Sequence, residues 1–132
     1  MGDYQKALEA AGAEVHAYES FGSYQGDWWA LVTVDGERGW VHGYYGSCSG
    51  CDAFEAEFGY DEDRCKRHQY EQPMPNCDQC RGAESAYLTK LADFGRDYLP
   101  PITQEAAEQK AAENLAWDSD AQEMLDFIKA HR

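Results

Sequence analysis

An antiparallel β-hairpin is predicted by the stretch Trp28-Trp29-Ala30-Leu31-Val32-Thr33-Val34-Asp35-Gly36-Glu37-Arg38-Gly39-Trp40-Val41. Asp35-Gly36 is a preferred dipeptide for a two-residue turn, and β-forming apolar residues flank it on both sides. In the first arm, positions 29, 31 and 33 alternate with positions 28, 30, 32 and 34, and both sets are largely apolar. We therefore expect this strand to lie in a sheet that is covered on both faces.

The pattern on either side of the hairpin predicts further elements. Strands are expected at residues 14–18, 28–34 and 39–45. Helical periodicity predicts helices at residues 4–11, 52–58, 84–99 and 104–116, and Ser119 with Gln122 matches a capping box that opens a last helix. The 132 residues are expected to form one α+β domain. Residues 1–60 would supply a helix, a small antiparallel β-sheet and a short helix, residues 61–82 a zinc-held loop region, and residues 83–132 a helical C-terminal part.

The five cysteines all lie between residues 48 and 80. They form three short motifs: Cys48-Ser-Gly-Cys51, Cys65-Lys-Arg-His68 and Cys77-Asp-Gln-Cys80. Two CxxC pairs are typical of a tetrahedral zinc site, because the two-residue gap lets both sulfurs of a turn reach one metal. We take such a site as the organising element, because residues 59–82 have little periodicity of their own. The predicted zinc ligands are Cys48, Cys51, Cys77 and Cys80, with Cys65 or His68 as substitutes for one of them.

Two other interpretations of the cysteines stay open. Cys48 and Cys51 follow a strand and precede a helix, as the cysteines of a thiol-redox pair do, although the βαβ pattern of a thioredoxin-like enzyme is missing. The thiols can also be incidental, without metal. No catalytic residue is predicted, because no nucleophile motif, phosphate-binding loop or HExxH is present. His16 and His42 are expected to be hydrogen-bonded histidines of the sheet.

The sequence is strongly acidic, with 25 Asp and Glu, 11 Lys and Arg, and a formal net charge of −14. Direct binding to nucleic acid is not expected, because affinity for phosphate comes mainly from basic side chains. A membrane location is not expected either, because no apolar run approaches the ~20 residues of a spanning helix. An acidic surface instead favours association with a basic protein partner.

The segment Phe21-Gly22-Ser23-Tyr24-Gln25-Gly26-Asp27 is the best candidate for contacting a partner. Its simpler interpretation is a long turn that closes the sheet. The functional interpretation is a recognition loop that displays Tyr24, Gln25 and Asp27, since glycines expose the backbone and aromatic side chains anchor interfaces.

The same loop also carries a resemblance. Gly22-Ser23-Tyr24-Gln25-Gly26-Asp27-Trp28, together with Tyr45-Gly46-Ser47-Cys48-Ser49-Gly50-Cys51-Asp52, resembles small uncharacterised proteins encoded by bacteriophages and their bacterial hosts. The likeness covers roughly residues 20–60 and carries over no activity. It implies a cytoplasmic setting in a bacterial host cell.

We therefore expect a non-enzymatic, acidic, zinc-stabilised protein-binding module. In its most specific form it is a phage-type inhibitor of a basic host nucleic-acid enzyme or defence complex. Two alternatives from other classes are a thiol-redox enzyme that uses Cys48 and Cys51, and a self-assembling structural protein.

Overall fold

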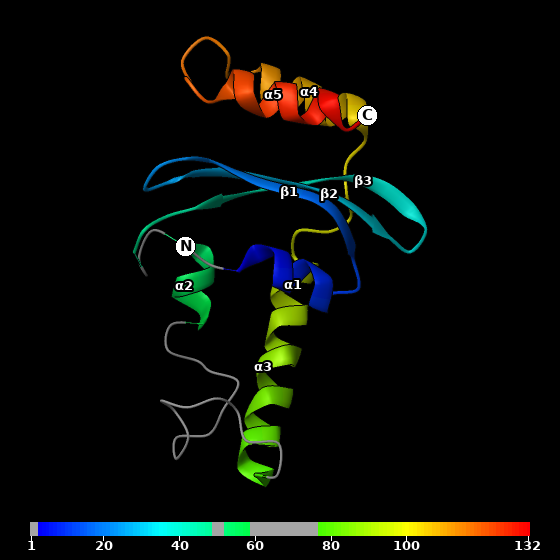
Figure 1. Cartoon of the computed structure of the whole chain (residues 1–132), viewed down its shortest axis with the longest axis vertical. Helices are drawn as coiled ribbons and strands as arrows, with labels where there is room; N and C mark the ends of the chain where they lie inside the picture. Colours follow the sequence, from blue (N-terminus) through cyan, green and yellow to red (C-terminus); the bar gives the residue numbers. More distant parts are fainter. Residues whose placement is uncertain (1–2, 49–51, 59–76) are drawn as a thin grey trace.

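A three-layer arrangement of helices and one sheet makes up the protein, for which a computed structural model describes residues 3–48, 52–58 and 77–132 (Figure 1). The middle layer is a three-stranded antiparallel sheet with the order β1-β2-β3, formed by β1 (Glu14–Gly22), β2 (Gly26–Val34) and β3 (Glu37–Tyr45). The predicted α+β class, with a small antiparallel sheet and a helical C-terminal part, is confirmed. The predicted zinc-held region, residues 61–82, lies mostly outside the described residues.

One face of the sheet packs on α1 (Tyr4–Ala10), α2 (Ala53–Phe58) and α3 (Asp78–Arg96). Trp28 is the centre of this layer, because its ring stacks on Tyr4 with centroids 5.1 Å apart and meets the edge of Tyr98 at the same distance. Gly95 lets α3 approach α1 closely, since a Cβ there would lie 2.0 Å from the Ala7 carbonyl oxygen.

The opposite face packs on α4 (Gln104–Ala112) and α5 (Ala121–Ala130). Trp29, Leu31 and Trp40 are buried there against small and aliphatic side chains of the two helices, namely Ala107, Ala111, Met124, Leu125 and Ile128. Odd and even positions of β2 therefore enter different clusters, which confirms the prediction that this strand is apolar on both sides because both faces are covered.

The chain passes from one helical layer to the other over the outer edge of β3. Trp40 and Ile102 exchange two backbone hydrogen bonds of 2.8 Å, so Ile102 adds a single bridge to the sheet. Gly39 makes this approach feasible, because a Cβ at that position would lie 2.5 Å from the Ile102 carbonyl oxygen. This bridge fixes where α4 begins.

Several predicted boundaries are wrong. α3 begins at Asp78, six residues before the predicted Glu84, and α4 ends at Ala112, before Leu115, which is 43% exposed instead of packed. The predicted capping box is also wrong, since the N-cap of α5 is Asp120 and makes no side-chain capping bond. Thr103 is the N-cap of α4, because its Oγ1 accepts a hydrogen bond from Ala106 N at 3.1 Å.

Within the described ranges, none of the helices has both the length and the hydropathy that crossing a membrane requires.

Candidate functional site

The connection between β1 and β2 is a tight tip of three residues, Ser23, Tyr24 and Gln25. Both flanking glycines are needed for its geometry. Gly22 has a φ of +106°, and a Cβ on Gly26 would lie 1.9 Å from the Phe21 carbonyl oxygen. The strands continue to the glycines, so the displayed loop is shorter than the predicted segment 21–27, and Tyr24 at its centre is 81% exposed.

An open hollow of about 590 Å³ lies between this tip and the start of α5. Residues 20–25 form one wall, and Ser119, Asp120 and Glu123 form the other. None of the nine described residues that line the hollow is Lys or Arg. The hollow therefore presents two carboxylates beside an exposed tyrosine, which is a chemistry that suits a cationic side chain.

Two more exposed aromatic side chains lie at the same end of the molecule. Tyr44 is 66% exposed and pairs with Asp27 next to the tip, and Trp117 is 77% exposed in the α4–α5 connection, which lies above the hairpin in Figure 1. Below, the loop end means Tyr24, Tyr44, Trp117, Asp120 and Glu123. Exposed tyrosine and tryptophan are typical of a protein-binding surface, because such rings dominate interface energetics.

Asp27 lies beneath the loop end and is already engaged. Its Oδ2 is 2.6 Å from His42 Nε2, with the Asp27 side chain 16% exposed and the His42 side chain 5% exposed. The imidazole stacks on Trp29 at 4.4 Å and meets the edge of Tyr44 at 4.9 Å. Of the three predicted partner-binding residues, Tyr24 and Gln25 thus line the hollow, whereas Asp27 connects β2 to β3 and supports the tip.

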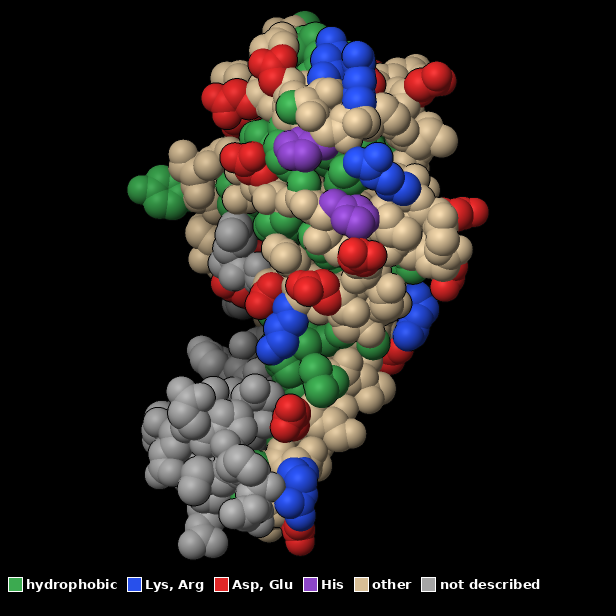
Figure 2. Space-filling view, turned by 45° about the vertical axis from the view of Figure 1, so that its right-hand side comes forward, with side chains coloured by type: hydrophobic (Ala, Val, Ile, Leu, Met, Phe, Trp, Pro, Cys, Tyr) green, Lys and Arg blue, Asp and Glu red, His purple; other side chains and the backbone are tan. Residues whose placement is uncertain are grey.

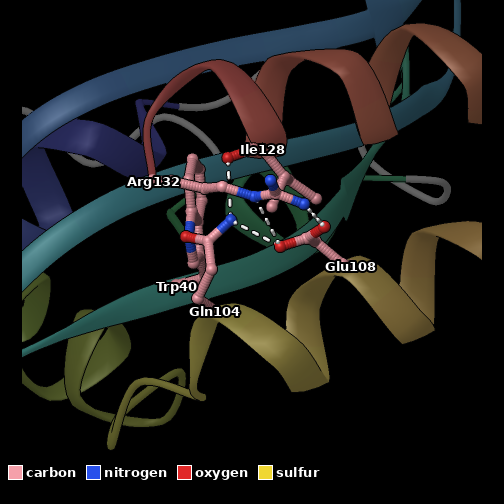
Figure 3. Close-up of polar contacts among 5 residues, drawn as sticks. All are labelled: Trp40, Gln104, Glu108, Ile128 and Arg132. Atoms are coloured by element: carbon pink, nitrogen blue, oxygen red, sulfur yellow. Dashed lines mark hydrogen bonds and ion pairs between the residues drawn. The ribbon is translucent and has the colours of Figure 1, made fainter.

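The other end of the α4/α5 layer is held by a chain of polar contacts, drawn in Figure 3. Trp40 Nε1 donates to Gln104 Oε1 at 2.8 Å, and Gln104 Nε2 donates to the Ile128 carbonyl at 2.9 Å and to Glu108 at 3.0 Å. Arg132 pairs with Glu108 at 2.7 Å. The network end denotes these five residues.

The charges at the network end are paired with each other, unlike the two carboxylates of the loop end. The Arg132 and Gln104 hydrogen bonds hold the pKa of the Glu108 carboxyl below its ordinary value, and Glu108 raises the pKa of Arg132. Arg38 donates to the His131 carbonyl nearby at 3.3 Å. On the side of the molecule seen in Figure 2, Lys and Arg side chains lie over the C-terminal helices and further along the molecule, with Asp and Glu side chains among them.

A buried carboxylate anchors the segment that follows β3. Asp52 is 1% exposed and accepts hydrogen bonds from Tyr4 Oη at 2.8 Å, from Gly46 N at 2.9 Å and from Glu55 N at 2.9 Å. Burial, together with this carboxylate, raises the pKa of Tyr4 above its ordinary value. Because Asp52 is satisfied by hydrogen bonds to two helices and a loop, we assign it a structural role.

The predicted zinc ligands are only partly described. Cys77 is the N-cap of α3 and Cys80 is buried one turn later, both as thiols, whereas the exposed Cys48 is disulfide-bonded. Cys51, Cys65 and His68 lie outside the described residues. No group of three His, Cys, Asp or Glu side chains suited to a metal occurs among the residues that the structure describes. A four-thiolate site would need Cys48 in its reduced form, and the zinc site stays a prediction.

The sheet histidines are placed as predicted. His16 Nε2 lies 2.7 Å from Thr33 Oγ1, and His42 contacts Asp27. Sequence reasoning missed Tyr44, Trp117, Asp120 and Glu123, because only the fold brings the α4–α5 connection to the β1–β2 tip. The one available signal was Trp117 next to Asp118, a large ring in a polar connection between two helices.

No protein-family model matches this chain, and comparison with curated proteins and with solved structures also finds no match.

Proposed function

We propose that the protein is a non-enzymatic binding module that contacts a basic protein partner through the loop end. The observation that supports this function is the hollow between the β1–β2 tip and α5, where Tyr24 lies beside Asp120 and Glu123 and no basic side chain is among the described lining residues. A partner lysine or arginine entering the hollow would meet a ring face and two carboxylates at once.

The charge of the whole chain supports the same proposal. A net charge of −14 attracts a cationic partner from a distance and raises the association rate, in a manner that salt reduces. The rings of Tyr24, Tyr44 and Trp117 then supply the short-range contacts, since buried aromatic anchors carry most of the energy of an interface. Long-range charge and local aromatic contacts therefore have separate roles.

In its most specific form, the proposed partner is a basic nucleic-acid enzyme or a defence complex of a bacterial host. This form rests on the acidic charge and on the resemblance of residues 20–60 to phage-encoded proteins. An acidic surface can occupy a basic site intended for nucleic acid. The predicted zinc would then stabilise the fold and take no part in binding.

A nona-arginine peptide is a defined probe for the first test. Titration of the full chain at low salt should show binding that weakens about threefold in Tyr24→Ala, the size expected for one exposed cation–π contact. Leu88→Ala on α3 is the matched control, because it also removes an exposed apolar side chain. Equal affinities for the two variants would contradict the proposed site.

A photo-crosslinking residue at position 24 tests the partner class. In a bacterial lysate it should capture a protein with a basic surface, and the same crosslinker at Asp35 in the β2–β3 turn should not. Capture of the same proteins from both positions, or capture of acidic proteins from position 24, would contradict the proposal.

A further inference from the structure

The Cys77-Asp78-Gln79-Cys80 motif opens α3, which has 19 residues and is the longest of the described helices. Cys77 is the N-cap, with φ of −97° and ψ of 117°, and Cys80 is the third helical residue. Side chains at the N-cap and at this third position face one another, as they do in a capping box. The fold thus places two thiols side by side at the start of a rigid element.

Access to the two thiols differs. Cys77 is half-buried, whereas Cys80 is only 1% exposed, and neither belongs to a disulfide. One accessible and one buried cysteine in a CxxC motif is the arrangement required for thiol–disulfide exchange, in which the first sulfur attacks and the second resolves.

The backbone permits a bond between the two sulfurs. Side chains three apart on a helix have Cβ atoms about 5–6 Å apart, and a disulfide needs about 4 Å. Cys77 has extended dihedral angles and makes no side-chain capping bond, while its carbonyl oxygen accepts the first hydrogen bond of α3, from Arg81 N at 3.0 Å. A Cys77–Cys80 disulfide changes only the two side chains and leaves this backbone hydrogen bond in place. Asp78 and Arg81 form an ion pair with each other on the same turn.

We propose that, in the chain without bound zinc, Cys77 and Cys80 form a dithiol pair that exchanges with disulfide substrates, independently of the binding function proposed for the loop end. The Cys77 thiolate attacks one sulfur of a substrate disulfide, a mixed disulfide forms, and the first substrate thiolate leaves and takes up the Cys77 proton. The Cys80 sulfur then attacks Cys77, the Cys77–Cys80 disulfide forms, and the second substrate thiolate leaves with the Cys80 proton. One substrate disulfide is reduced to two thiols, and the protein dithiol is oxidised to one disulfide.

Glutathione disulfide is the probe, applied to the full chain after reduction and dialysis against a chelator. Trypsin releases residues 68–81, a peptide that contains Cys77 and Cys80 and no other cysteine. We expect this peptide to become lighter by two hydrogen atoms as the ratio of oxidised to reduced glutathione rises. A peptide that keeps both thiols, or that retains glutathione in the wild-type protein, would overturn the proposal.

Two variants separate the roles of the sulfurs. Cys80→Ser should accumulate one stable glutathione at Cys77, because the resolving thiol is missing. Cys77→Ser should leave Cys80 unmodified over the same time, because Cys80 is buried. Glutathione on Cys80 in Cys77→Ser at the rate seen for Cys77 in Cys80→Ser would overturn the assignment, and circular dichroism of both variants checks that α3 stays folded.

Discussion

The two ends of the α4/α5 layer differ in how they meet the sheet. At the network end, Trp40, Gln104 and Glu108 connect β3 to both helices through hydrogen bonds. At the loop end, the helices and the β1–β2 tip diverge around a hollow of about 590 Å³, with Tyr24 and Trp117 pointing to solvent. The network end holds the layers together, and the loop end leaves side chains exposed to solvent.

The two β-hairpins show the same difference. The β2–β3 turn is the minimal two-residue turn, in which Asp35 and Gly36 have positive φ values of 52° and 81°, as a type I′ turn requires. The β1–β2 tip adds a residue and uses it to display Tyr24. The proposed function uses this exposed ring as a contact with the partner.

The largest expected effect on stability comes from adding a side-chain atom at the close backbone contact of the β1–β2 tip. Gly26→Ala should lower the free energy of unfolding by about 3 kcal/mol, because the new Cβ overlaps the backbone at Phe21 and cannot be accommodated by a side-chain rotation. Gly36→Ala meets nothing within 4 Å and should cost about 1–2 kcal/mol from its positive φ alone. Urea denaturation measures both values, and an equal loss in the two turns would show that the tip is not tightly constrained.

The support beneath the tip should give the next largest effect. Asp27→Ala leaves the His42 imidazole buried without its partner and should cost about 2 kcal/mol. Thr33→Val removes the corresponding contact of His16, which is solvent-exposed, and should cost about 0.5 kcal/mol or less. Thermal unfolding of the two variants measures the difference, and similar costs would mean that Asp27 is not part of the support.

The β2–β3 hairpin was predictable from the sequence because its signals are local, whereas β1 was predicted to end at residue 18 and runs to Gly22. Asp35-Gly36 specifies its turn, alternating apolar residues specify both faces of β2, and Thr103 marks the start of α4. The helix ends were less predictable. Leu115 continues the apolar spacing of α4, but the helix has already ended, and the side chain is exposed.

The loop end was only partly predictable, for a physical reason. Tyr24 and Gln25 stand out in a glycine-bounded loop, but Asp120 and Glu123 lie about a hundred positions away and look like ordinary charges at the start of a helix. Asp27 was predicted to be displayed to a partner but contacts His42 instead. An aspartate in a polar loop gives no sign that a histidine from the next strand will bind it. Long-range packing decides both cases.

The contribution of the network end to stability is expected to depend on pH through Glu108. Because the folded-state pKa of Glu108 lies below its ordinary value of 4.5, this carboxylate stabilises the fold above that value, and the contribution is lost as the pH falls through the lower, folded-state value. Glu108→Gln should therefore be less stable than the wild-type protein at pH 7, and this difference should shrink as the pH falls below 4.5. Glu105→Gln removes the same charge from the same helix and serves as the control. A difference between Glu108→Gln and the wild-type protein that persists unchanged at low pH would contradict the network.

The smallest effect on stability is expected at Trp117. Three of the four tryptophans, Trp28, Trp29 and Trp40, are buried, whereas Trp117 is 77% exposed. Trp117→Phe should change the free energy of unfolding by no more than about 0.5 kcal/mol while removing most of the fluorescence that acrylamide quenches. Quenching that is unchanged in this variant would show that Trp117 is not the exposed ring at the loop end.

The most direct test of the binding account compares two charge-matched variants in their affinity for nona-arginine at low salt. Asp120→Asn/Glu123→Gln removes two carboxylates at the hollow, and Asp35→Asn/Glu37→Gln removes two at the opposite hairpin, so both change the formal net charge from −14 by the same amount. We predict that the first pair weakens binding about fivefold and flattens its salt dependence, and that the second weakens it less than about twofold. Equal losses in the two variants would show that the peptide responds to overall charge and would contradict a binding site at the loop end.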